Sequence, residues 1–199
     1  GGEPPAPREL VLVVDRSGSM GGAPIEQARA SVRAALAALR PGDRFNVIAF
    51  DDKLEALYPA SRPASPEALA AARRFVDHLD ARGGTEMRPA LDLALPSTER
   101  DAEEAAGWPR QVVFITDGAV GNERALFARI RERLGRARLF TVGIGAAPNS
   151  WFMRRAAEVG RGTFVHVGRR EEAGPAMDSL LARLASPVLT DIDVRWPTG

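Results

Sequence analysis

Short apolar runs alternate with amphipathic stretches along most of the 199-residue chain. The apolar runs are rich in valine and isoleucine, which is typical of strands that are covered on both faces in a parallel sheet. Between these runs, apolar residues recur at the spacing of helices that bury one face. The alternation predicts an α/β fold: a doubly wound, mostly parallel sheet flanked by helices, with one short antiparallel edge strand.

The individual elements follow from this pattern together with helix and turn signals. Strands are predicted at residues 10–15, 43–50, 111–118, 138–145 and 162–167, with a hairpin partner in 51–58. Helices are predicted at residues 23–40, 65–81, 122–135, 149–160 and 171–185, and after a glycine turn in 82–95. Ser65 is the expected N-cap of its helix, with Pro66 at the first helical position.

Both ends of the chain depart from the alternation. Residues 1–8 are rich in Gly and Pro and are predicted to form a linker. In 187–196 apolar and polar residues alternate strictly, as in a half-exposed antiparallel strand. We therefore expect one domain over 9–186, and at 187–199 a strand or linker that leads into a following module. The opening residues carry no signal-peptide features, and we expect the chain to be part of a longer multidomain protein.

Composition narrows the classes of function. The chain has 27 basic and 26 acidic residues, a net charge of +1, so nucleic acid is not an expected partner. Because there is no cysteine, disulfides, thiolate metal sites and cysteine nucleophiles are excluded. Lys53 is the only lysine, and no phosphate-binding loop with its own lysine is present. No apolar run reaches the ~18 residues of a membrane span, so none is expected in this sequence.

Oxygen-bearing side chains follow the predicted strands at the points where the strands end. Asp15 closes the first strand and Asp117 lies at the end of the strand at 111–118. In a doubly wound sheet the winding reverses between these two strands, so their carboxyl ends form a crevice. Ser17, Ser19 and Thr85 lie on glycine-bearing turns and are expected there too. Two adjacent carboxylates repel unless a cation intervenes, and an all-oxygen set favours Mg²⁺, with Mn²⁺ or Ca²⁺ as alternatives.

Three segments, "VVDRSGSM", "GGTEM" and "VFITDG", resemble the metal-ion-dependent adhesion site of a von Willebrand factor type A (VWA) domain. The resemblance covers residues 8–186 and implies a Rossmann-like fold. It also implies a role for each of the five residues. Ser17, Ser19 and Thr85 would contact a divalent cation directly, and Asp15 and Asp117 would hold it directly or through water.

The same resemblance implies a function. The chain is similar to bacterial proteins in which this domain follows a module of the type found in inter-alpha-trypsin-inhibitor heavy chains. The resemblance implies a metal-dependent adhesion or protein-binding module, not an enzyme. The remaining position on the metal would take water or an acidic residue from a protein partner. Family analogy favours an exported, periplasmic or cell-surface setting.

Two alternatives stay open. In some Mg²⁺-dependent phosphohydrolases an aspartate nucleophile ends the first strand, as Asp15 does here. Their pattern has a second aspartate two residues later, where this chain has Ser17, and a lysine in a segment other than that of Lys53. The other alternative is a structural VWA domain with a vestigial metal site.

Overall fold

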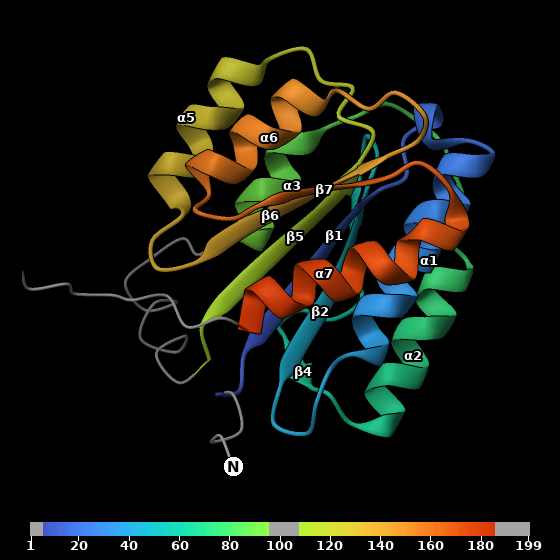
Figure 1. Cartoon of the computed structure of the whole chain (residues 1–199), viewed down its shortest axis with the longest axis vertical. Helices are drawn as coiled ribbons and strands as arrows, with labels where there is room; N and C mark the ends of the chain where they lie inside the picture. The colour runs from blue at the N-terminus through green and yellow to red at the C-terminus, as the bar shows by residue number, and fades with distance from the viewer. Residues whose placement is uncertain (1–5, 96–107, 186–199) are drawn as a thin grey trace, which may run out of the picture.

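The computed structural model describes residues 6–95 and 108–185, which fold around one central sheet (Figure 1). Its strands are β1 (Glu9–Asp15), β2 (Arg44–Phe50), β3 (Leu54–Ala56), β4 (Arg62–Pro63), β5 (Arg110–Thr116), β6 (Arg138–Ile144) and β7 (Phe164–Val167). The helices are α1 (Ala23–Ala37), α2 (Pro66–Asp77), α3 (Met87–Ala94), α5 (Glu123–Arg133), α6 (Ser150–Val159) and α7 (Ala173–Ala185). Two short 3₁₀ turns are η1 (Gly18–Met20) and η3 (Arg170–Glu172).

The sheet is doubly wound, as predicted. Its strand order is β3-β2-β1-β5-β6-β7, and β1 pairs in parallel with both β2 and β5. The winding direction therefore reverses between β1 and β5, and the carboxyl ends of these strands lie side by side. The predicted antiparallel edge strand is β3. The structure adds β4, which also pairs antiparallel with β2 and is too short to show a periodic pattern.

Helices cover both faces of the sheet (Figure 1). Along β1, Leu10, Leu12 and Val14 pack into a core that includes residues of α1, α2 and α7. The alternate residues Val11 and Val13 pack into a second core with residues of α3, α5 and α6. Because both faces are buried, the strand reads as a continuous apolar run rather than an alternating one. Among the described residues, no helix combines the length and the apolar character needed to cross a bilayer.

Two helices end earlier than predicted, the first in a local turn and the second at a contact with another helix. After α1, the Asp43 N–H donates to the Arg40 carbonyl and its carboxylate accepts from the Arg40 N–H, both at 3.0 Å. After α2, Leu79 is buried and its carbonyl accepts a hydrogen bond from the Arg29 guanidinium. The predicted linker lies mostly outside the described residues, and the predicted strand at 187–196 lies entirely outside them.

Replacing Ser65 with alanine is expected to lower the free energy of unfolding by about 1 kcal/mol. Ser65 is the N-cap of α2, as predicted, because its hydroxyl oxygen accepts a hydrogen bond from the Ala68 N–H at 3.2 Å. Urea unfolding measures the loss. The matched control Ser65→Asp keeps a capping oxygen and should unfold like the wild type. An equal loss in both variants would contradict the capping role.

Candidate metal centre

Asp15 is the last residue of β1 and its side chain is buried between the two central strands. One carboxylate oxygen, Oδ1, accepts a hydrogen bond from the Ser17 N–H at 2.8 Å. The other, Oδ2, accepts one from the hydroxyl of Thr116, the last residue of β5, at 2.5 Å. The carboxylate is therefore held in one orientation at the winding reversal. The ends of β1 and β5 that form this reversal lie in the upper part of Figure 1.

The two serines lie in the tight turn that follows β1. Ser17 is buried, Ser19 is exposed, and their hydroxyl oxygens lie 3.2 Å apart. The turn is fixed by a hydrogen bond from the Met20 N–H to the Ser17 carbonyl at 2.9 Å and by the buried Met20 side chain. The hydroxyl oxygens of Ser17 and Ser19 are thus two uncharged candidate metal ligands beside the Asp15 carboxylate.

Thr85 lies in the loop before α3, which main-chain hydrogen bonds attach to the loop after β1. The Arg82 N–H donates to the Arg16 carbonyl at 2.7 Å, and the Gly18 N–H donates to the Gly83 carbonyl at 3.1 Å. Gly83 adopts φ +68°, which favours glycine. Thr85 itself is half-buried, and among the described residues no hydrogen bond joins its hydroxyl to the other four predicted ligands.

Asp117 directly follows β5 and is half-buried. Its carboxylate accepts a hydrogen bond from the Ala119 N–H at 3.0 Å, and its carbonyl accepts one from the Asn149 N–H at 2.9 Å. Gly118 turns the chain at φ +76° and donates its N–H to the Thr116 hydroxyl at 3.0 Å. The side chain of Asp117 thus remains near the end of β1 without a direct bond to Asp15.

The electrostatics of the two aspartates favour a cation. Burial raises the pKa of Asp15, hydrogen bonds from Ser17 and Thr116 oppose this rise, and the negative charge of Asp117 adds to it. A divalent cation would relieve both the desolvation and the repulsion. In the described part of the chain no three His, Cys, Asp or Glu side chains gather as a metal site, so hydroxyl oxygens would have to complete the ligand set. The chemistry of these donors fits a hard cation such as Mg²⁺.

All five predicted residues lie at the carboxyl end of the sheet, but the structure joins only some of them directly. Hydrogen bonds link Asp15 with Ser17, and Ser17 with Ser19, whereas Thr85 and Asp117 are placed by the backbone of their loops. The sequence analysis missed Thr116, whose hydroxyl orients Asp15. It also missed the buried carboxylate of Asp51, which directly follows β2, whereas Asp15 is the last residue of β1. An acidic residue directly after an apolar strand was the signal that could have identified it.

Comparisons with known proteins give the same fold and a family. A family model described as von Willebrand factor type A domain matches residues 8–166. Inter-alpha-trypsin inhibitor heavy chain H4 of Homo sapiens is 30% identical over 201 residues, which covers 97% of this chain and 22% of that protein. The chain spans about a fifth of the length of the first curated relatives that it matches.

Solved structures share the fold at lower identity. A von Willebrand factor type A protein from Catenulispora acidiphila has a TM-score of 0.76 and 24% identity, covering 89% of this chain and 42% of the other. The manganese-loaded TRAP protein of Plasmodium vivax has a TM-score of 0.66 and 22% identity, covering 88% of this chain and 73% of the other. At these identities the likeness shows the common fold.

Proposed function

This chain belongs to the von Willebrand factor type A domain family, and from that premise we propose that it is a metal-dependent protein-binding or adhesion module. The observation that carries the proposal is the oxygen cluster at the winding reversal. There a buried Asp15 lies beside the hydroxyls of Ser17 and Ser19, whose oxygens are 3.2 Å apart. The negative charge of Asp117 acts on Asp15 as well and raises its pKa. Such a set suits the binding of a divalent cation.

We propose a role for each residue. Ser17, Ser19 and Thr85 would contact the cation through their hydroxyl oxygens. Asp15 and Asp117 would hold it directly or through water. Mg²⁺ is the first choice, with Mn²⁺ or Ca²⁺ as alternatives, because all five side chains offer hard oxygen ligands. The bound cation would act as a Lewis acid toward an oxygen of the partner.

A carboxylate from a protein partner is the proposed ligand for the remaining metal position. Three of the five proposed ligands are neutral hydroxyls, and an aspartate that acts through water cancels less charge than one in direct contact, so the cation keeps part of its charge and attracts an external Asp or Glu. The rim of the site also offers an aromatic contact. Trp151 is 62% exposed, and the helix that carries it begins directly after Asn149, whose N–H is bonded to the Asp117 carbonyl. Exposed tryptophan is enriched at protein interfaces.

The environment of Asp15 speaks against the phosphohydrolase alternative. A nucleophilic carboxylate must reach the phosphorus atom of a bulky phosphate ester, whereas the side chain of Asp15 is fully buried at the end of the sheet. The vestigial alternative predicts the same fold without cation binding, so a binding measurement separates it from our proposal.

We also propose a setting for the domain. It would span residues 9–186, and 187–199 would lead into a following module of a longer protein. Analogy with the family supports an exported, periplasmic or cell-surface location.

An open metal position can be tested without knowing the partner. Adding Mn²⁺ to the protein should enhance the longitudinal relaxation of water protons, because a bound ion that keeps an exchanging water relaxes the solvent efficiently. Sodium acetate should then reduce the enhancement as its carboxylate replaces that water. Sodium chloride at equal ionic strength is the control, since it screens charge without offering a carboxylate. Absence of enhancement, or an equal effect of both salts, would contradict the proposed site.

A further inference from the structure

We infer that Arg82 is a positioning residue for the metal centre, acting through the buried carboxylate of Asp51 to hold the loop that carries Thr85. The inference rests on the function proposed above. Neither Arg82 nor Asp51 is one of the five proposed metal ligands.

Asp51 is the point where three segments meet. It directly follows β2 and is 1% exposed. Its Oδ2 accepts hydrogen bonds from Arg16 Nε at 2.9 Å and from Arg82 Nε at 3.0 Å. Its main-chain carbonyl accepts a hydrogen bond from the Glu86 N–H at 2.8 Å. One residue therefore connects the loop after β1, the end of β2 and the loop before α3.

Arg16 makes the connection rigid. It stands between Asp15 and Ser17 in the chain, and its own side chain is only 6% exposed because it points toward Asp51 and Glu55. The Arg16 carbonyl also accepts a hydrogen bond from the Arg82 N–H at 2.7 Å. Arg82 is thus bonded to the first metal-binding loop through its backbone and to Asp51 through its side chain.

The carboxylate at the centre of this cluster stays ionised. Burial raises the pKa of Asp51, but hydrogen bonds from Arg82 and from the Lys53 N–H, with the positive charge of Arg16, lower it to about 2. Asp51 therefore attracts both arginines at any pH at which the protein would function. A charged, hydrogen-bonded group of this kind defines geometry more strictly than a neutral one.

The segment from 82 to 86 needs such anchors, because Gly83 and Gly84 leave its backbone free to adopt other conformations. Arg82 anchors the segment before the glycines and the Glu86 N–H anchors it after Thr85, while the Gly83 carbonyl accepts a hydrogen bond from the Gly18 N–H at 3.1 Å. Arg82 is bonded to Arg16 and Asp51, and the Glu86 N–H is bonded to the Asp51 carbonyl. Loss of one anchor should let the Thr85 hydroxyl move away from the serines, although every proposed ligand remains present.

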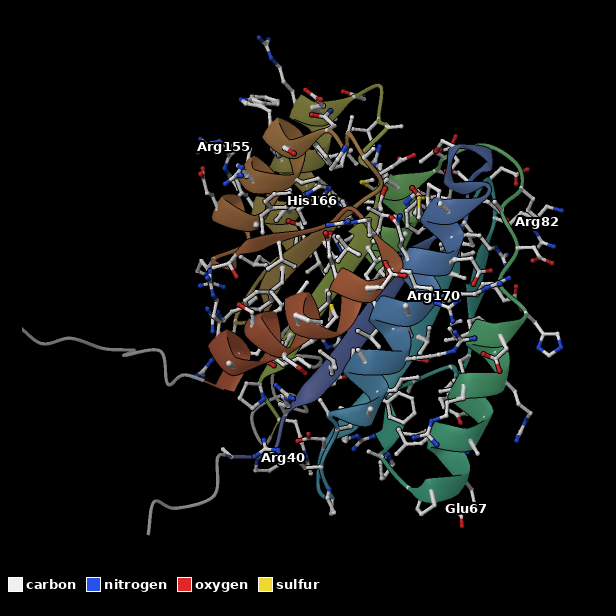
Figure 2. All side chains as sticks on the ribbon, turned by 45° about the vertical axis from the view of Figure 1, so that its right-hand side comes forward. Arg40, Glu67, Arg82, Arg155, His166 and Arg170 are labelled. Carbon is white, nitrogen blue, oxygen red and sulfur yellow. The ribbon has the colours of Figure 1, made fainter. Side chains whose placement is uncertain are left out.

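The sign of the effect separates positioning from electrostatics. Figure 2 shows Arg82 on the loop beside the start of α1, at the same end of the molecule as the proposed site. Removal of a positive charge near a cation site should tighten cation binding by electrostatics alone. If Arg82 holds the loop, its removal should weaken binding instead. Mutation of a residue that holds a metal ligand in place without touching the metal typically lowers metal affinity by about 10–100-fold. For Arg82 we expect a loss of about 10-fold.

The variants for this test are Arg82→Gln, Arg82→Lys and the charge-matched control Arg88→Gln, an exposed position in the first turn of α3. Mn²⁺ affinity is measured by calorimetry. We expect about 10-fold weaker binding for Arg82→Gln, a smaller loss for Arg82→Lys and no loss for Arg88→Gln. Because the Arg82 side chain is 61% exposed, the apo unfolding temperature of Arg82→Gln should fall by less than about 3 °C.

Amide hydrogen exchange in the absence of metal provides the second readout. Exchange of the Arg82 and Glu86 N–H groups should accelerate in Arg82→Gln and remain unchanged in Arg88→Gln. The inference is overturned if the wild type binds Mn²⁺ and Arg82→Gln binds it as tightly or more tightly. If the wild type binds no Mn²⁺, the proposed function fails and this inference fails with it.

Discussion

Asp117→Ala is expected to weaken Mg²⁺ or Mn²⁺ binding by at least about 100-fold, which corresponds to about 2.7 kcal/mol of binding free energy. The variant removes one of the two negative charges of the proposed centre, and even partners outside the ligand shell are typically worth 10–100-fold. Asp117 is better suited to this test than the buried Asp15. It is half-buried, and its carboxylate accepts one hydrogen bond among the described residues, from the Ala119 N–H. The variant should therefore fold.

Calorimetry with the cation and thermal unfolding with and without it measure this loss. Mg²⁺ should raise the unfolding temperature of the wild type, since a ligand that binds only the folded state stabilises it, and should leave that of Asp117→Ala unchanged. The matched control is Glu67→Gln, which removes one negative charge at the end of the molecule opposite Arg82 (Figure 2). Equal binding heats in wild type and Asp117→Ala would refute the assignment of this residue.

Gly162→Ala is expected to destabilise the fold by about 3 kcal/mol, the upper part of the range for overpacking a tight contact. A Cβ atom at residue 162 would lie 2.0 Å from the Leu139 carbonyl oxygen. The obstacle is the backbone of β6, which pairs with β5 and β7, so it cannot move without disturbing the sheet. For a domain of this size, the unfolding temperature should fall by roughly 6–12 °C.

Gly174→Ala is the control for this prediction. Gly174 lies in α7, and a Cβ atom there meets nothing within 4 Å. Alanine has the higher helix propensity, so this variant should be as stable as the wild type or slightly more stable. Differential scanning calorimetry compares the two. Similar unfolding temperatures for both variants would show that the Leu139 contact yields at little cost.

The sequence alone was sufficient for the doubly wound sheet, for most helices and for the placement of Asp15 and Asp117 at the ends of neighbouring strands. These features depend on local patterns. The valines of β1 form a continuous apolar run because helices cover both faces, and the alternation of strands with helices leads to parallel pairing. Asp15 and Asp117 end strands that the winding rule places side by side, and β1 and β5 are indeed paired.

Only the tertiary structure decided how that site is held together. Thr116 and Asp15 are 101 residues apart in the chain, and Arg82 and Asp51 are 31 apart, yet each pair shares a hydrogen bond. The periodicity of the sequence does not predict such contacts. Any of the arginines could pair with a given buried carboxylate, and only the packing of the elements determines which one lies close to it. The early end of α2 has the same origin, since the Leu79 carbonyl bonds to Arg29 of α1. Local patterns specify elements and their order, whereas long-range polar contacts depend on how close packing leaves the side chains.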